Sequence, residues 1–127
     1  MPDRHMSIVD AHVVLRRDGK ILLLRRGANT YASGQLCLPS GIILNVGALP
    51  LVLAMHQRNP DGQARFGFFF EPQQWAGEPV NREPHKHTEL IWASSRQLPP
   101  DTAGYAAKAI TAIEHGSHFT INGWDST

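Results

Sequence analysis

The sequence predicts a β-rich domain of the α+β class. Three observations support this class. The pair Asp18-Gly19 separates two aliphatic runs, which is typical of a β-hairpin because both residues tolerate positive φ. The apolar run 66–70 has the composition of a buried strand. A segment late in the chain, 102–115, repeats apolar residues at helical spacing.

In the first half of the chain, aliphatic and β-branched residues predict strands over 7–16 and 20–26. A polar loop is expected over 27–34. The short run 36–38 predicts a further strand, which Pro39 ends because proline lacks the donor that a ladder requires.

The second half predicts a strand over 49–57, a turn at Asn59-Pro60-Asp61-Gly62 and a returning strand over 65–71. The composition of that returning strand suits one covered on both faces.

Two prolines predict a loop over 77–84, and a further strand is expected over 88–93. The helix predicted over 102–115 stops at Gly116. The tail 117–127 is polar apart from Phe119, Ile121 and Trp124, which can pack back on the domain.

Size and charge restrict the class of protein. A chain of 127 residues predicts a single domain, 1–127. A net charge of +1 gives no global reason to expect nucleic acid or an anionic membrane as a partner. The lone cysteine, Cys37, lies in an apolar run, where we expect a small buried hydrophobe rather than a reactive thiol. Without an internal disulfide, a signal sequence or a spanning segment, we expect a cytoplasmic protein.

Two blocks carry a resemblance to a known family. The run 13–26 is similar to the paired strands that open a Nudix hydrolase (MutT-like) domain, and Gly34-Gln35-Leu36-Cys37-Leu38-Pro39-Ser40-Gly41 resembles the strand and loop that lead into its signature box. Trp92, followed by Leu98-Pro99, resembles the closing strand and turn of the family. The resemblance covers about residues 8–115 and implies a mixed β-sheet sandwiched by helices.

The signature box itself is absent. In the family, the glycine begins the pattern G-x5-E-x7-R-E-U-x-E-E-x-G-U, whose glutamates hold metal ions. Here Gly41 is followed directly by Ile42, as though the first and last glycines of the pattern were fused. The sequence has no acidic residue between Asp18 and Asp61. The catalytic box helix is therefore missing between Gly41 and Ile42, and one face of the sheet is expected to lack cover.

The resemblance implies hydrolysis of a nucleoside diphosphate derivative assisted by Mg²⁺ or Mn²⁺, because hard divalent cations bind carboxylate oxygens and activate water. Outside the box it implies two metal-site positions. The backbone carbonyl of Ser40 would contact metal, and Glu83 would be a metal-binding and catalytic carboxylate. From the residues alone, Ser40 is equally a turn residue after proline, and Glu83 is a solvated loop charge.

Substrate contacts are expected from four charged residues. Arg25 and Arg26 end the second strand, where relatives place arginines near the substrate, and guanidinium groups suit phosphate. Strand alternation allows only one of the two to face the site. Lys86 is a further phosphate candidate, and Glu71 is either a substrate contact or the polar end of the sheet.

Three interpretations follow from the junction at Gly41-Ile42. With a box segment in the intact protein, the chain is a Nudix pyrophosphohydrolase. With a true deletion, it is a catalytically inactive nucleotide-binding or scaffold module, in which the open sheet face favours a homodimer. The third, an unrelated β-rich ligand-binding domain, is disfavoured because several blocks follow the family order.

Overall fold

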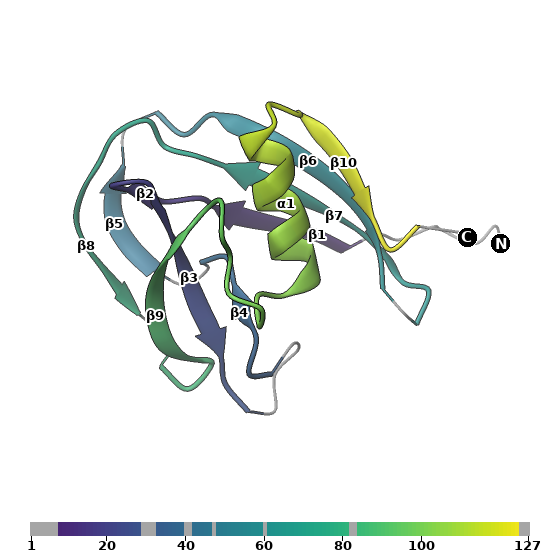
Figure 1. The fold of residues 1–127 in the computed structure, drawn as a ribbon, viewed down its shortest axis with the longest axis horizontal. Coiled ribbons are helices and arrows are strands. Elements are labelled where there is room, and N and C mark those ends of the chain that lie inside the picture. The colour runs from purple at the N-terminus through teal and green to yellow at the C-terminus, as the bar shows by residue number, and fades with distance from the viewer. Residues whose placement is uncertain are drawn as a thin grey trace, which may run out of the picture.

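The computed structural model describes residues 8–28, 33–39, 42–46, 48–59, 61–81 and 84–124, with the backbone alone for 42–46 and 81. Within these ranges the chain forms ten strands in three sheets and one helix (Figure 1). The predicted α+β class is confirmed.

The first sheet, called sheet A, has four strands in the order β1 (Ile8–Val13), β7 (Ala64–Phe70), β6 (Leu51–Arg58) and β10 (Phe119–Asn122). Strand β1 runs parallel to β7, and β10 runs parallel to β6. Strands β6 and β7 are antiparallel. Sheet A is therefore mixed, as the resemblance implied.

The second sheet, sheet B, is antiparallel. It contains β2 (Arg16–Arg17), β3 (Lys20–Arg26), β4 (Leu36–Cys37) and β9 (His87–Ser94), with β3 at its centre. The hairpin between β2 and β3 turns at Asp18 and Gly19, whose φ angles are 53° and 78°. The Asp-Gly turn predicted from the sequence is confirmed.

The single strand predicted over 7–16 is divided in the structure. Its first part is β1 in sheet A, and its last residue opens β2 in sheet B. Val14 and Leu15 between them are fully buried. The backbone N–H of Val14 bonds Phe70 of sheet A at 2.8 Å, and the Leu15 carbonyl accepts from Leu22 of sheet B at 3.1 Å. The aliphatic run therefore crosses from one sheet to the other through the core.

The prediction of a loop over 77–84 is wrong for 77–81, which the structure describes as part of a strand. Strand β8 (Trp75–Asn81) pairs with β5 (Ile42–Val46) in a separate two-stranded sheet. The register shifts between Ile43 and Asn45, so Pro79 falls where the ladder is irregular. Proline is tolerated at such bulges and in edge strands because no donor is needed there.

The tail also differs from the prediction, because Phe119–Asn122 adds a strand to sheet A instead of only packing on the domain. The predicted helix is confirmed as α1 (Gly104–Glu114). Gly116 follows it with φ of 77°, and its N–H bonds the Ile113 carbonyl at 3.0 Å. This is the glycine stop that the sequence indicated.

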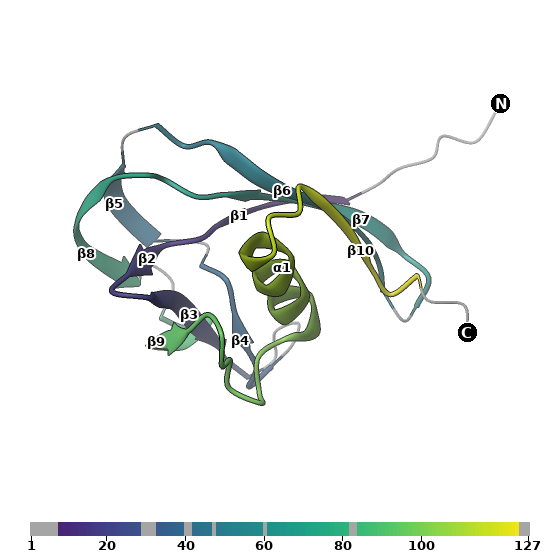
Figure 2. The same ribbon diagram turned by 45° about the horizontal axis from the view of Figure 1, so that its top comes forward.

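Helix α1 packs on one face of sheet A, called its inner face, and Figure 2 shows the helix beneath that sheet. The core joins both sheets and the helix, and its fully buried members include Ile21, Leu23, Leu53, Phe69 and Ile110. Among the described residues, no helix lies on the opposite face of sheet A. Phe66, Phe68 and Phe70 are half-buried, so the described residues cover the run 66–70 fully on one face and only partly on the other.

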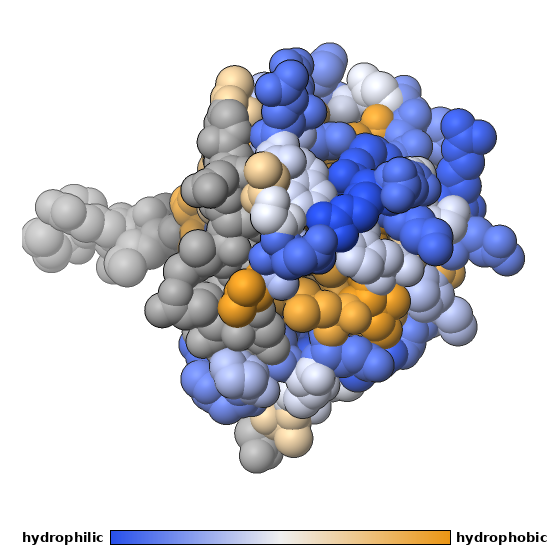
Figure 3. Space-filling model, turned by 90° about the vertical axis from the view of Figure 1, so that its left-hand side faces the viewer, coloured by the Kyte–Doolittle hydropathy of each residue, from blue (hydrophilic) through white to orange (hydrophobic). Residues whose placement is uncertain are grey.

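Among the residues that the structure describes, no helix has the length and apolar character needed to cross a membrane. The side of the molecule seen in Figure 3 is mostly hydrophilic where it is coloured, and one apolar cluster lies among polar residues there.

Candidate functional site

A pocket of about 240 Å³ opens where both sheets meet the N-terminal end of α1. Its lining comes from six parts of the chain, namely Asp10, Ala11 and His12 of β1, Arg26 of β3, Leu38 after β4, Gln57 of β6, Arg65 of β7 and Tyr105 of α1. Two guanidinium groups, one carboxylate and an imidazole thus share a single concave site. Pockets with a few convergent polar groups are the usual positions of small-molecule sites.

The two consecutive arginines of β3 have different environments. Arg26 lines the pocket, and its Nη1 lies 3.5 Å from Nε2 of the buried His87. Arg25 instead forms ion pairs of 2.6 Å with Glu89 and with Asp101, and donates to the Gly34 carbonyl at 2.8 Å. The pairing of β3 with β9 is irregular between these two residues, and only Arg26 lines the pocket.

Arg65 and Asp10 form the second charged feature of the pocket. Arg65 Nε lies 2.8 Å from a carboxylate oxygen of Asp10, and both side chains are partly exposed. The parallel register of β1 and β7 places Asp10 opposite Gly67 and beside Arg65. Asp10 therefore compensates one of the two guanidinium charges, and Arg26 leaves the lining with a net positive charge.

His12 is held in the pocket wall by stacking. Its ring lies 4.7 Å from the Phe69 ring with an interplanar angle of 17°, and 5.1 Å from the Tyr105 ring. A Cβ on Gly67 would meet the Phe69 ring at 3.1 Å and the His12 ring at 3.6 Å, so glycine leaves room for this stack. Burial lowers the pKa of His12, opposed by Asp10 and assisted by Arg65.

This lowered pKa predicts a loss of stability in weak acid. Below about pH 6.5 the unfolded chain protonates this histidine while the folded chain resists, so stability falls as the pH drops toward the folded pKa. We expect His12→Phe, which keeps a ring on Phe69, to lose less stability between neutral and weakly acidic pH than the parent chain. Urea unfolding at several pH values measures this, and identical pH profiles would contradict it.

Tyr105 and Cys37 form the buried rear of the site. Burial raises the pKa of both groups, so the hydroxyl and the thiol are neutral at physiological pH. The Leu38 N–H donates to the Tyr105 hydroxyl at 3.3 Å. Cys37 is a free, buried cysteine, as the sequence predicted.

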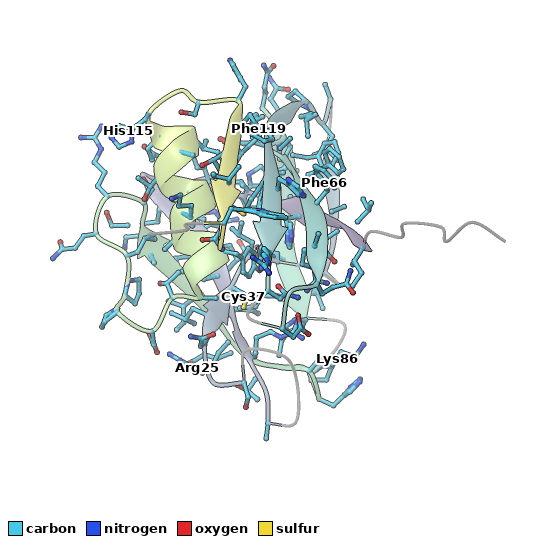
Figure 4. All side chains as sticks on the ribbon, turned by 90° about the vertical axis from the view of Figure 1, so that its right-hand side faces the viewer. Arg25, Cys37, Phe66, Lys86, His115 and Phe119 are labelled. Atoms are coloured by element: carbon cyan, nitrogen blue, oxygen red, sulfur yellow. The ribbon has the colours of Figure 1, made fainter. Side chains whose placement is uncertain are left out.

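Besides Arg25, two more of the predicted substrate residues, Glu71 and Lys86, lie outside the pocket lining. Glu71 forms an ion pair of 2.7 Å with Arg16, which also pairs with Glu114 at 2.6 Å, so Arg16 of sheet B links Glu71, after β7, to the end of α1. The Lys86 side chain is exposed, and its carbonyl accepts the Gly27 N–H at 2.7 Å. Figure 4 shows Arg25 and Lys86 projecting at the same end of the molecule.

The predicted metal residues, Ser40 and Glu83, lie outside the described residues, as does Gly41 at the junction. In the part of the chain that is described, no three His, Cys, Asp or Glu side chains group to hold a metal ion. The pocket contributes one carboxylate, Asp10, and Arg65 already pairs with it. The donor set described here does not fit the divalent cation that the resemblance implies.

Most of the pocket lining was not predicted from the sequence. Asp10, His12 and Arg65 sit in strands whose pairing is parallel and distant in sequence, so no local pattern could join them. Tyr105 was recognised only as part of a helical repeat. The sequence expected only one of Arg25 and Arg26 to face the site, and of the two only Arg26 lines the pocket.

No protein-family model matches the chain, and no curated protein matches it. Several solved structures do match the chain. A MutT NUDIX hydrolase from Burkholderia pseudomallei is 19% identical with a TM-score of 0.73, covering 84% of this chain and 98% of that one. A NUDIX hydrolase from Nitrosomonas europaea is 14% identical with a TM-score of 0.68, covering 90% and 93%.

A third similar structure contains a ligand. The NUDIX domain of Shewanella oneidensis NrtR, in complex with ADP ribose, is 13% identical with a TM-score of 0.63, covering 88% of this chain and 89% of that one. Identities at this level establish the fold alone. The three sheets and single helix described above therefore form a Nudix-like fold, as the resemblance in the sequence indicated.

Proposed function

We propose that this chain binds a phosphorylated small molecule, of the nucleoside diphosphate class, in the pocket between the two sheets. The observation that carries the proposal is the presence of Arg26 and Arg65 in one pocket of a Nudix fold. Guanidinium groups bind phosphate through paired, charge-assisted hydrogen bonds. The ADP-ribose complex of the similar Shewanella domain supports this class of ligand.

The pocket is divided into a cationic side and an apolar side. Arg26 supplies the net positive charge, while Leu38, Tyr105 and the His12 ring supply apolar and aromatic surface. At about 240 Å³ the pocket is smaller than the roughly 300–1,000 Å³ typical of sites that enclose a whole ligand. We therefore expect it to hold one part of a dinucleotide-like ligand, with the remainder extending over the surface.

We propose that the chain binds this ligand without cleaving it in a metal-dependent reaction. The sequence has no acidic residue from 19 to 60, where the family places its metal-binding glutamates. The one carboxylate of the pocket lining is paired with Arg65. Nothing described in the chain can therefore hold a divalent cation against a diphosphate, and recognition rests on the arginines.

Titration calorimetry with ADP-ribose in the presence of EDTA tests this proposal. We expect saturable binding at one site per chain, weakening as salt rises because phosphate contacts are screened. Inorganic pyrophosphate should compete if the cationic side binds the diphosphate. Absence of binding for ADP-ribose, UDP-glucose and dGTP alike would overturn the proposal.

Hydrolysis is the second candidate, favoured by the fold shared with Nudix hydrolases. It requires a box segment between Gly41 and Ile42, together with Glu83, and the sequence contains only the latter. Incubation with Mg²⁺ or Mn²⁺, followed by chromatography of the nucleotide, distinguishes the two functions. Release of a nucleoside monophosphate that depends on metal and is lost in Glu83→Gln would establish the hydrolase and refute the binding module.

A further inference from the structure

The face of sheet A opposite α1 is called the outer face. It is aromatic along β7, one of the two central strands of the sheet. Phe69 of that strand points to the inner face and is fully buried, so strand alternation places Phe66, Phe68 and Phe70 on the outer face. All three are half-buried. In Figure 4, α1 lies on one side of the sheet and Phe66 on the other.

The register of β1 extends this apolar surface to one edge of the sheet. Val9 lies opposite Phe66, Ala11 opposite Phe68, and Val13 opposite Phe70. Partners in adjacent strands project to the same face, so the three β1 residues join the phenylalanines. Val9 is 64% exposed.

The other edge is apolar as well. Phe119 and Ile121 of β10 lie opposite Ala54 and His56 of β6, on the outer face. They are 57% and 47% exposed. Leu51, opposite Phe70, is 51% exposed. The apolar surface thus crosses all four strands.

Charge is nearly absent from this face. Of the outward positions on the four strands, only Arg58, at the end of β6, carries a charge. The central His56 stacks on the Phe66 ring at 4.3 Å, and the Trp124 ring lies tilted against it at 4.5 Å. Solvated sheet faces usually present polar side chains at alternate positions. This face lacks that protection, and none of its outward-facing strand residues is a carboxylate that would repel or attract a charged partner.

The area of the face is close to the smallest area that specific interfaces bury. Four strands about 4.8 Å apart, with a rise of roughly 3.3 Å per residue, give a flat footprint of about 400–500 Å². Two such footprints brought together cover about 800–1,000 Å², close to the roughly 1,000 Å² that a specific interface should bury, before the surface of the protruding side chains is added. The footprint alone reaches the size of the largest apolar patch on a typical monomer, roughly 300–600 Å².

We propose that the outer face of sheet A is a homodimer interface, on which the same face of a second copy of this chain packs. A flat, uncharged aromatic face is complementary to another such face, and a two-fold axis brings identical patches together. Two sheets pack face to face about 10 Å apart with interdigitating side chains. The apolar cluster in Figure 3 is a weaker candidate because polar residues lie around it.

Sedimentation equilibrium of the full chain tests the interface. We expect a dimer of twice the 14.1 kDa chain mass at micromolar concentration. Val9→Glu and Phe119→Glu, at opposite edges of the face, should each raise the dissociation constant at least about tenfold. Each substitution occurs twice in a symmetric dimer, so burying the new carboxylates opposes association strongly.

Val80→Glu is the matched control, since Val80 is 53% exposed in a strand of another sheet. It should leave the dimer intact. Circular dichroism and thermal unfolding of each variant confirm that the monomer stays folded. A parent chain that remains monomeric at about 100 μM, well above the micromolar affinities of ordinary complexes, overturns the proposal. A dimer that Val80→Glu dissociates, and that Val9→Glu and Phe119→Glu leave intact, also overturns the proposal.

Discussion

Phe69→Ala is expected to destabilise the protein by about 3–5 kcal/mol, the typical cost of emptying a buried aromatic site. Phe69 is fully buried in the core that joins sheet A, sheet B and α1. Its ring also supports His12 in the pocket wall at 4.7 Å. The substitution therefore leaves a cavity in the core and removes the stacking surface beneath the candidate site.

Phe69→Leu is the control for this experiment. Leucine retains much of the apolar volume, so its cost should be smaller, about 1–2 kcal/mol. Urea unfolding followed by tryptophan fluorescence measures both free energies. A cost below about 1 kcal/mol for Phe69→Ala would mean that the three elements do not share one core through this residue.

Arg26→Ala is expected to weaken ADP-ribose binding by about 10- to 100-fold, equivalent to the roughly 1.5–3 kcal/mol of a hydrogen bond to a charged group. Arg26 provides the net positive charge of the pocket, because Asp10 pairs with Arg65 at 2.8 Å. Removing Arg26 leaves a neutral lining that has no electrostatic preference for phosphate.

Arg25→Ala is the matched control, one residue earlier in the same strand. Arg25 pairs with Glu89 and Asp101 outside the pocket, so its loss should change ligand affinity less than about threefold, since exposed ion pairs contribute little. Calorimetry of both variants, with melting temperatures to confirm folding, gives the comparison. Equal losses for the two variants would place the binding site elsewhere.

Local sequence signals predicted many of the individual elements. The Asp18-Gly19 turn, the strand β3, and α1 with its glycine stop each depend on residues close together in the chain. Strand β8 was missed because Pro79 and Gly77 indicate a loop, and only pairing with β5 across an irregular register allows a strand there. Strand β10 was missed because its four residues are extended only through their pairing with β6.

The candidate site was less predictable than the fold. Alternation along β3 separates Arg25 from Arg26 in the sequence itself, but which of them faces the pocket depends on the packing of sheets A and B. Asp10 and Arg65 are 55 residues apart, and the parallel pairing of β1 with β7 brings them together. The predicted roles of Ser40 and Glu83 lie outside the described residues and stay predictions.

The sequence by itself determined many of the individual strands and turns, the helix and the absence of acidic residues from 19 to 60, because these are local properties of the chain, and its resemblance to the Nudix family indicated the fold. Only the tertiary structure decided where a cationic pocket forms and which sheet face is left open. Both depend on the pairing of strands that are distant in sequence. This pairing sets which side chains converge, and burial then shifts the pKa of His12 among them.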